Sequence, residues 1–378
     1  MAANKTIRTI KLKFHNQSTP FLAVNLESIR RKYRTLNQYF PHKGIYYAVK
    51  ANPAVEVISA LRDLGSCFDI ASIYELDRVI SLGVSPTRIS FGNTIKKKKE
   101  IAYAFDRGVN LFACDSIEDL KNIAQAAPCS KVFFRLSTDG SGSDWPLSKK
   151  FGCHPDRIIT LIIAARALKL IPKGISFHVG SQQKDIGQWK SALSTCRYIF
   201  NYVKRKKITL DMINLGGGFP CTYIEPINSL QKYCTEILSY VKETFSDIGP
   251  EILIEPGRAL TGEAGTLVTE VILVTKKDKM DLYKWVYLDA GLFGGLIETL
   301  GEAIKYPVYC ERIGKTQEVI LAGPTCDSVD IMYQNYKYQL PANLRAGDKL
   351  YIGSTGAYTA SYSSIEFNGF PPLSTVYY

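Results

Sequence analysis

The chain has 378 residues, enough for two domains or more, and its 46% hydrophobic and 22% charged residues are the proportions of an ordinary globular protein rather than a disordered one. Its formal net charge of +12 suggests nucleic acid or a membrane surface, but the basic runs 96–99 and 204–207 lie in helix-like segments, which we interpret as solvated helix faces. Nine cysteines without regular spacing form neither a disulfide framework nor a zinc motif, which indicates a reducing, cytoplasmic location and no metal site.

The N-terminal segment 1–19 lacks the apolar stretch of a signal peptide. Residues 6–14 alternate apolar and basic side chains, which is typical of a strand with one buried face. We therefore predict an N-terminal strand that pairs into a sheet formed by the C-terminal part of the chain. Residues 26–39 are predicted to form the helix that enters the floor of the fold described next.

Residues 45–255 alternate short apolar or β-branched runs with helix-like segments such as 55–64 and 73–82. Each run is bounded by Gly, Pro, Asn or Asp. The eight runs are 45–49, 67–71, 88–91, 110–114, 132–136, 175–179, 212–215 and 252–255. Eight successive βα units predict an α/β fold, a (β/α)8 or TIM barrel, which we assign to residues 20–260.

After Pro256 the pattern changes to strands separated by turn residues, with little helix. The predicted strands are 266–276, 285–289, 318–321 and 349–352. We assign residues 261–378 to a β domain, joined by the N-terminal segment 1–19. Because no linker or low-complexity stretch separates the parts, we expect them to pack tightly.

Polar side chains follow the predicted barrel strands at the point where each strand ends. In a (β/α)8 barrel these ends form the rim that carries the active site. The strand-end residues are Lys50, Asp69, Arg135, His178, Gly180, Ser181, the glycines 216–218, Glu255 and Arg258. An amine, an imidazole, a triglycine, a carboxylate and a guanidinium are therefore expected to converge on one rim.

These residue types suit pyridoxal phosphate (PLP). Lys50 follows an apolar strand, where burial would lower its pKa and make the amine reactive toward an aldehyde, although a lone strand-end lysine can also simply extend to water. Glycine-rich backbone N–H groups can approach a phosphate, and Ser181 and Arg258 could complete the phosphate cup. Glu255 could keep the pyridine nitrogen protonated or pair with Arg258. His178 could stack on the ring or be a core residue bonded to backbone.

Eight motifs identify a family resemblance: YAVKAN, FDIAS, FFRLS, SFHVGS, LGGGFP, EPGR, GPTCDSVD and GAYTASYSSIEFNGF occur in this order. With them the chain resembles, from Pro20 to Tyr377, the fold-type III PLP decarboxylases of ornithine, lysine, arginine and diaminopimelate. It is most similar to the ornithine/lysine decarboxylase-like members. The resemblance implies a TIM barrel with an alanine-racemase-like β domain, a bound PLP, and a head-to-tail homodimer with shared active sites.

The resemblance also implies individual roles. Lys50 would carry the cofactor, Cys326 of the neighbouring subunit would reprotonate Cα, and His178 and Glu255 would complete the catalytic set. Asp327 would bind the distal ammonium of the substrate, with Asp330 nearby. The implied cofactor-binding residues are Lys50, Asp69, Arg135, His178, Ser181, Gly217, Gly218, Glu255, Arg258 and Tyr358, and the implied pocket wall is Phe367 and Asn368. Without the resemblance, Cys326 could be merely buried and Asp327 a turn residue.

Asp327 stands where diaminopimelate decarboxylases carry a glutamate, and an acidic pocket suits the distal amine of ornithine or lysine. The chain departs from eukaryotic ornithine decarboxylases at Gly301 and Glu302, which replace a Tyr-Asp pair that also grips this amine. Glu302 or Glu298 could take the part of that aspartate. The predicted reaction converts ornithine or lysine to a diamine and CO2, as in polyamine biosynthesis. The alternative substrates are diaminobutyrate, diaminopimelate, or a siderophore or polyamine intermediate.

Three rival functions remain at this point. A fold-type III racemase would share the barrel, but racemases place an arginine rather than a glutamate at the pyridine nitrogen, which Glu255 argues against. A non-catalytic decarboxylase-like regulator would not need Lys50, His178 and Cys326. A nucleic-acid binder is supported by charge alone. The apolar stretch 158–171 is too short for a membrane span, so we expect neither nucleic acid nor a membrane as a partner.

Overall fold

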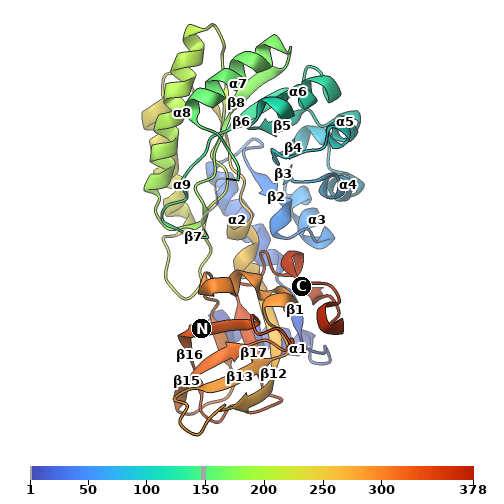
Figure 1. Cartoon of the computed structure of the whole chain (residues 1–378), viewed down its shortest axis with the longest axis vertical. Helices are drawn as coiled ribbons and strands as arrows, with labels where there is room; N and C mark the ends of the chain where they lie inside the picture. The colour runs from blue at the N-terminus through green and yellow to red at the C-terminus, as the bar shows by residue number, and fades with distance from the viewer. Residues whose placement is uncertain (1, 146–149) are drawn as a thin grey trace. The chain divides into compact units, whose positions relative to one another are not determined.

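A computed structural model describes residues 2–145 and 150–378 of the chain (Figure 1). They divide into two compact units. The barrel unit contains residues 29–220 and 227–260, and the remaining residues form the sheet unit. Residues 20–28 and 221–226, which fall in the range expected for the barrel, belong to the sheet unit.

The barrel unit is built on eight parallel strands, one for each predicted run, in the order β2-β3-β4-β5-β6-β8-β10-β11. A parallel bridge between Ile45 and Ile254 joins the two ends of this order, and the N–H of Tyr46 donates to the carbonyl of Ile254 at 2.9 Å. The predicted (β/α)8 barrel is therefore confirmed. The strands are β2 (Tyr46–Ala48), β3 (Cys67–Ile70), β4 (Ile89–Phe91), β5 (Leu111–Cys114), β6 (Lys131–Arg135), β8 (Ile171–Ser176), β10 (Met212–Asn214) and β11 (Glu251–Leu253).

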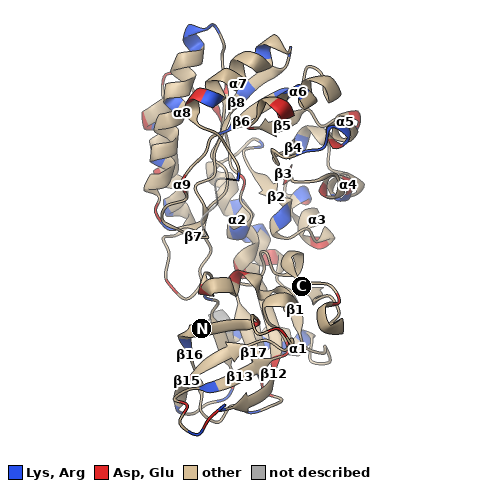
Figure 2. Ribbon diagram, in the orientation of Figure 1, with Lys and Arg blue, Asp and Glu red and all other residues tan. Residues whose placement is uncertain are grey.

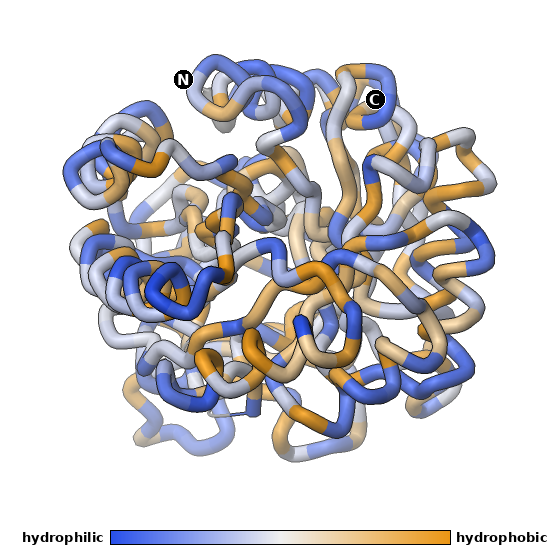
Figure 3. Tube along the Cα trace, turned by 90° about the horizontal axis from the view of Figure 1, so that it is seen from above, coloured by the Kyte–Doolittle hydropathy of each residue, from blue (hydrophilic) through white to orange (hydrophobic). Residues whose placement is uncertain are grey.

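Helices follow these strands in turn along the chain. Hydrophilic and hydrophobic positions are interspersed along the helices (Figure 3). In α2, for example, Ile29, Tyr33 and Leu36 are buried at spacings of four and three residues, which places them on one helix face. The helices are α2 (Leu26–Tyr39), α3 (Val55–Asp63), α4 (Ile73–Ser81), α5 (Lys98–Asp106), α6 (Ile117–Ala126), α7 (Pro155–Ala167), α8 (Gly187–Arg205), α9 (Leu230–Phe245) and α10 (Arg258–Thr261), with short 3-10 turns η1 (Val49–Ala51) and η2 (Pro86–Arg88).

Serine side chains define where three of these helices begin. Ser72, Ser116 and Ser229 each accept a hydrogen bond from the backbone N–H three residues later, at 3.2 to 3.3 Å. Such a cap satisfies one of the N–H groups that a helix leaves unpaired at its start. Each helix therefore begins at a fixed residue after its strand or loop, which also fixes the loop between them.

The interior of the barrel holds a layer of buried side chains, to which six of the eight strands contribute one residue each. They are Tyr46, Cys67, Ala113, Phe133, Met212 and Leu253. A barrel of this kind is a packed core rather than a pore. Polar groups with chemical roles are therefore expected beyond this layer, at the strand ends.

The sheet unit contains a mixed sheet of eight strands, in the order β14-β17-β12-β13-β15-β16, with β1 paired to β12 and β18. Strand β1 is antiparallel to β12 and parallel to β18, so segments from both ends of the chain meet in one sheet. The strands are β1 (Phe21–Val24), β12 (Gly265–Thr275), β13 (Lys284–Leu288), β14 (Val308–Cys310), β15 (Thr316–Ala322), β16 (Ile331–Pro341), β17 (Lys349–Gly353) and β18 (Ser374–Tyr377). The short helical turns are η3 (Gly262–Ala264), η4 (Leu292–Leu296), η5 (Ile297–Glu302), η6 (Ala360–Tyr362) and η7 (Phe367–Gly369).

The N-terminal segment is a helix, α1 (Ala2–Lys13), so the strand predicted for residues 6–14 is wrong. Ile7, Ile10 and Phe14 recur at spacings of three and four residues, which fits one face of a helix as well as a strand pattern. The two isoleucines are buried in an apolar cluster of the sheet unit, with Phe14 packed against it. Burial of this face selects the helix, and β1 makes the expected pairing with the C-terminal sheet instead.

Strand β16 was not predicted, because its sequence mixes tyrosines with Gln, Asn and Lys and does not alternate regularly. Opposite β15, the pairing is Val319 with Tyr338 and Leu321 with Tyr333. Five residue steps in β16 therefore lie opposite two steps in β15, so β16 forms a bulge between these pairs. A bulge removes the period of two on which strand prediction depends.

Lysine and arginine are spread over several helices, including α2, α5 and α8 (Figure 2). In the part of the chain that the structure describes, no helix has the length and apolar content needed to cross a membrane. Over the same residues, no group of three or more His, Cys, Asp or Glu side chains is arranged to hold a metal ion.

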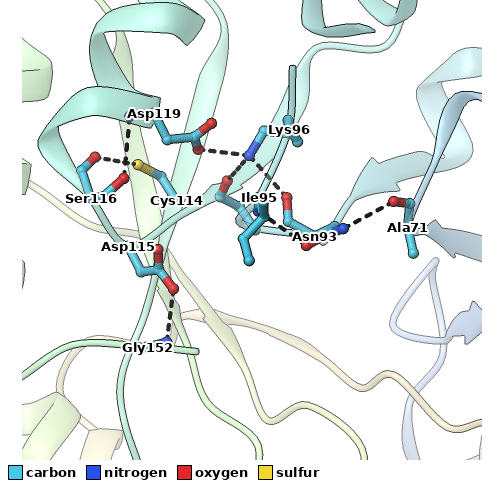
Figure 4. Close-up of polar contacts among 10 residues, drawn as sticks. Ala71, Asn93, Ile95, Lys96, Cys114, Asp115, Ser116, Asp119 and Gly152 are labelled. Atoms are coloured by element: carbon cyan, nitrogen blue, oxygen red, sulfur yellow. Dashed lines mark hydrogen bonds and ion pairs between the residues drawn. The ribbon is translucent and has the colours of Figure 1, made fainter. Parts of the chain in front are cut away.

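Lys96 contradicts the interpretation of the run 96–99 as a solvated helix face. Its ammonium donates to Asp119 Oδ2 at 2.7 Å and to the carbonyls of Asn93 and Ala113 at 2.9 and 2.8 Å (Figure 4). The side chains of Lys96 and Asp119 are 0% and 8% exposed. Lys96 precedes the first residue of α5, so it turns inward, whereas the three lysines that follow it are exposed.

Further hydrogen bonds extend this ion pair along the rim of the barrel. The Asn93 side-chain amide donates to the carbonyl of Ala71, just after β3, and Asp115, just after β5, accepts from the N–H of Gly152 at 2.8 Å (Figure 4). The loops that follow β3, β4, β5 and β6 are therefore linked to one another by hydrogen bonds. We infer that this belt keeps the strand ends in register with one another.

The Lys96–Asp119 pair gives the first testable prediction. Replacing Lys96 with Met leaves a buried carboxylate without its cation, which should lower the free energy of unfolding by about 3–5 kcal/mol. The double variant Lys96→Met/Asp119→Leu should recover most of this loss, because it removes both charges. Urea unfolding followed by circular dichroism measures both, with the exposed Lys99→Met as control. A single variant as stable as the parent would contradict the prediction.

Candidate active site

The barrel strands bring the predicted cofactor residues of the barrel unit to one rim. Lys50 lies in η1, directly after β2, and Asp69 lies in β3. Arg135 is the last residue of β6, His178 follows β8 by two residues, and Glu255 follows β11 by two residues. All five side chains are thus at or just beyond the C-terminal ends of parallel strands, where a (β/α)8 barrel carries its chemistry.

The charges of these side chains act on one another, which shows that they form one cluster. Burial and the charge of Glu255 raise the pKa of Asp69 well above its ordinary value, and Lys50 opposes this. Burial lowers the pKa of Arg135, while Glu255, Asp115 and Asp69 raise it. Perturbed groups of this kind are concentrated at functional sites.

Lys50 is exposed, whereas its neighbours Val49 and Ala51 are buried. This differs from the expectation that an apolar environment shields the amine from water. The short turn after β2 anchors the backbone through the two flanking residues and directs the lysine side chain to the surface of the rim. Its reactivity therefore has to come from its position beside a bound group rather than from burial within the chain alone.

His178 is held as a neutral imidazole. Its Nδ1 accepts a hydrogen bond from the N–H of Gly180 at 3.1 Å, which leaves the ring proton on Nε2. Burial, followed by the positive charges of Arg135 and Lys50, lowers the pKa of His178 well below its ordinary value. Thr138 donates to the His178 carbonyl at 2.5 Å. An uncharged flat ring fixed in this way is suited to stacking on another flat ring.

Asn214 holds Glu255 in place, and sequence analysis did not identify it. The Asn214 side-chain amide donates to Glu255 Oε1 at 2.5 Å, and its Oδ1 accepts from the N–H of Gly216 at 2.9 Å. One asparagine therefore links the carboxylate to the glycine loop. The position two residues before a triglycine was the available signal. Within the described residues no ion pair joins Glu255 to Arg258, the structural alternative considered for this glutamate.

The glycine loop after β10 requires glycine for steric reasons. Gly216 has φ +68°, and a Cβ there would lie 1.9 Å from the carbonyl of Phe177. A Cβ on Gly217 would lie 2.9 Å from both His178 Nε2 and the carbonyl of Glu255. The backbone of this loop therefore passes directly beside the imidazole and the glutamate. Gly218 continues the loop and accepts a hydrogen bond from Gln183 at 2.9 Å.

Arg258 and Ser181 meet beside this loop. The guanidinium of Arg258, a residue only 3% exposed, directs Nε and Nη2 at Ser181 Oγ, each at 3.1 Å. Ser181 begins β9 (Ser181–Gln183), which pairs with β7 (Ser143–Trp145). Gln183 was not predicted, but its side chain donates to the Val179 carbonyl at 2.6 Å and so braces this turn. A cation, a hydroxyl and a glycine-rich backbone are the usual donors to a phosphate.

Asp69 is buried and accepts from Ser90 Oγ at 3.0 Å. A Cβ on Gly92 would lie 2.1 Å from Asp69 Oδ1, so the loop after β4 passes close to this carboxylate. Burial and the nearby charge of Glu255 raise the pKa of Asp69 well above its ordinary value, which disfavours a negative charge on Asp69. Glu255, which Asn214 orients, is therefore the carboxylate that we assign to a protonated nitrogen.

Cys326 and Asn368, from separate loops of the sheet unit, lie together. Cys326 is exposed, which excludes the reading of a merely buried cysteine, and its N–H donates to Asn368 Oδ1 at 2.8 Å. The ring of Phe367 lies 4.6 Å from that of Phe293. Asp327 is partly exposed, and its Oδ1 accepts from the N–H of Val329 at 2.9 Å.

The other sheet-unit carboxylates predicted to contact substrate are already hydrogen-bonded. Asp330 is buried and accepts from the N–H of Leu292 at 2.8 Å, and from the N–H and hydroxyl of Thr325 at 3.1 and 2.7 Å. Glu302 accepts three backbone N–H groups of β16. The substrate contacts of Asp330 and Glu302, and the phosphate contact of Tyr358, stay predictions.

The barrel-unit residues fit PLP by the chemistry of their side chains. Lys50 supplies an amine for the aldehyde, and Glu255 a carboxylate for the pyridine nitrogen. Arg258 and Ser181 supply phosphate donors next to a loop that a single added Cβ would block. His178 supplies an uncharged ring. Each functional group of the cofactor thus has a partner of matching chemistry on the same rim.

Comparison with known proteins agrees with this chemistry. Residues 26–262 match the family model of the pyridoxal-dependent decarboxylases, pyridoxal binding domain. Over 369 residues the chain is 30% identical to the lysine/ornithine decarboxylase of Selenomonas ruminantium, covering 97% of this chain and 91% of that protein.

Solved structures agree as well. The lysine/ornithine decarboxylase of Vibrio vulnificus complexed with cadaverine has a TM-score of 0.89 at 29% identity, with 98% of each chain covered. The arginine decarboxylase of Paramecium bursaria Chlorella virus bound to agmatine has a TM-score of 0.90 at 27% identity, covering 99% of this chain and 100% of that one. The chain therefore belongs to the pyridoxal-dependent decarboxylase family, as its motifs predicted, and its cofactor is pyridoxal phosphate.

Proposed function

We propose that this enzyme removes the α-carboxylate of ornithine or lysine and releases the diamine and CO2. The observation that carries the proposal is the single rim on which Lys50, Glu255 and Arg258 meet, each matched to a different part of PLP. The names of the Selenomonas and Vibrio relatives support a basic amino acid as substrate. Arginine is the second candidate, because the viral structure of TM-score 0.90 is an arginine decarboxylase.

The residues of the barrel unit have distinct tasks in this reaction. Bound PLP supplies an electron-accepting ring for the electron pair that remains on Cα when CO2 leaves. Glu255, oriented by Asn214, keeps a proton on the ring nitrogen. Arg258, Ser181 and the N–H groups of the glycine loop hold the phosphate. His178 would offer an uncharged ring to a face of the cofactor, and Lys50 would supply the amine that holds its aldehyde.

Cys326 is proposed to return a proton to Cα. Its exposure on a loop fixed by Asn368 supports this role. In the proposed homodimer, this loop of one subunit completes the active site of its partner. A dimer would then be required for turnover, and dilution below its dissociation constant should abolish activity. The expectation of a cytoplasmic location stays a prediction.

Asp327 is proposed to bind the distal ammonium of the substrate. Only its Oδ1 is hydrogen-bonded within the described part of the chain, to Val329, which leaves Oδ2 for the ligand. An ammonium removed from water needs such a carboxylate, because an unpaired buried charge is costly. Diaminobutyrate, diaminopimelate and siderophore or polyamine intermediates remain alternatives for substrates of different length.

Lys50→Ala should abolish both turnover and the visible absorbance of the lysine-bound cofactor, because no other side chain at this position can hold the aldehyde. CO2 release measures turnover, and an absorbance spectrum recorded after dialysis against PLP measures the visible band. Lys206→Ala, an exposed lysine after α8, is the matched control. If the Lys50 variant kept both the band and the activity, the assignment of this lysine would be wrong.

Ornithine, lysine, arginine, diaminobutyrate and diaminopimelate should be offered separately to the PLP-loaded enzyme and the amine products identified by mass spectrometry. We expect putrescine or cadaverine as the main product. Asp327→Asn should raise KM for that substrate about 100-fold, since a charge-assisted contact of about 3 kcal/mol is lost. Asp106→Asn, an exposed site, is the control. Diaminopimelate as the preferred substrate would contradict the proposal.

The lowered pKa of His178 predicts how stability depends on pH. Below about pH 6.5 the unfolded chain binds a proton at this residue and the folded chain does not, so stability falls as pH falls. The measurement is urea unfolding between pH 5.5 and 7.5. Below pH 6.5, the free energy of unfolding of the parent should fall by about 1.4 kcal/mol per pH unit relative to that of His178→Asn. Parallel curves for the two proteins would show that His178 is not held neutral.

A further inference from the structure

Glu302 lies in an unusual turn of the sheet unit. Gly301 and Glu302 both have left-handed backbone conformations, with φ of 61° and 57°. The Glu302 carboxylate accepts from the N–H groups of Gln334 and Asn335 through Oε1, at 2.7 and 2.5 Å, and of Tyr336 through Oε2, at 2.9 Å. Both carboxylate oxygens are therefore engaged by consecutive backbone groups of one segment.

These three N–H groups belong to the bulge of β16. The bulge lies between Tyr333 and Tyr338, where β16 has more residues than β15 can pair with. Backbone N–H groups that leave a sheet ladder need other acceptors, and successive N–H groups that point to one side form a binding place for an anion. The Glu302 carboxylate, from the same chain, is the anion that these N–H groups bind.

Two buried tyrosines hold the segment that follows Glu302 against the same bulge. Tyr333 Oη donates to the carbonyl of Ile304 at 2.8 Å and accepts from the N–H of Tyr306 at 3.1 Å. Tyr338 Oη donates to the Tyr306 carbonyl at 2.6 Å. The residues that flank the bulge therefore hold positions 304–306, while the bulge itself holds position 302.

The pKa of Glu302 is consistent with this arrangement. Burial would raise it, but the backbone hydrogen bonds, that from Asn335 first, lower it below its ordinary value. The carboxylate therefore remains charged and hydrogen-bonded at neutral pH. The three N–H donors use three of about four acceptor positions of the carboxylate, so at most one remains for a substrate ammonium.

We propose that Glu302 is a positioning residue that fastens the segment 297–306 to the β16 bulge and is not a ligand of the substrate's distal amine. The inference rests on the proposed function only for its second part. Recognition of the distal amine then falls to Asp327, because Asp330 is also held by backbone and hydroxyl donors. Glu298, the other candidate, is buried and accepts a hydrogen bond from Tyr306 Oη at 3.5 Å.

The first experiment tests the clamp without using activity. Residue-resolved hydrogen exchange by mass spectrometry is compared for the parent, Glu302→Gln, Glu302→Ala and the control Glu318→Gln, an exposed glutamate on β15. Loss of a hydrogen bond of about 1.4 kcal/mol should speed exchange of the 334–336 amides about tenfold in Glu302→Ala, with a smaller effect in Glu302→Gln. Unchanged exchange in both Glu302 variants would overturn the clamp.

The second experiment tests whether Glu302 binds the amine. KM is measured for lysine and for norleucine, which has the same length without the distal amine. In Glu302→Gln both KM values should change by the same factor, so their ratio stays within about twofold, whereas loss of an amine ligand would raise KM for lysine alone about 100-fold. A selective rise would overturn the proposal. If the parent turned over no basic amino acid, the proposed function would fail, while the exchange experiment would still judge the clamp.

Discussion

The closure of eight parallel strands into a barrel is the constraint on which the site depends. All strands run in the same direction, so their C-terminal ends meet on one rim although the residues there are separated by as many as 208 positions in sequence, from Lys50 to Arg258. The bridge between Ile45 and Ile254 brings the first and last strands together. This bridge places Lys50 and Glu255, from opposite ends of the barrel sequence, in one electrostatic cluster with Asp69.

The rim holds two lysines, Lys96 and Lys50, whose surroundings indicate a structural role for the first and a chemical role for the second. The three donor positions of the Lys96 ammonium are used by Asp119 and two carbonyls, in a side chain shielded from water. The Lys96 amine therefore links the loop after β4 to β5 and α6 and has no position left for a further acceptor. Lys50 is exposed, and its charge acts on both Asp69 and the neutral His178. Of the two lysines, it is therefore the one that is both accessible to an aldehyde and near the groups that PLP needs.

Much of the fold followed from periodicity, because all eight barrel strands are short, apolar and bounded by turn residues. Prediction failed where a second force decided the outcome. In α1, isoleucine spacing fitted two structures and burial against the sheet unit chose the helix. In β16, the bulge removed the alternation. Asn214, Gln183 and the engagement of Glu302 were not predictable, because each depends on hydrogen bonds between segments distant in sequence.

The central claim is that PLP is held on this rim by Lys50. It is tested most directly by reducing the PLP-loaded enzyme with borohydride, which fixes the cofactor to the amine that holds it, and mapping the modified peptide by mass spectrometry. We predict one modified lysine, Lys50, in the peptide that spans the end of β2. Modification at Lys96 or at any lysine of the sheet unit, with Lys50 unmodified, would contradict the account.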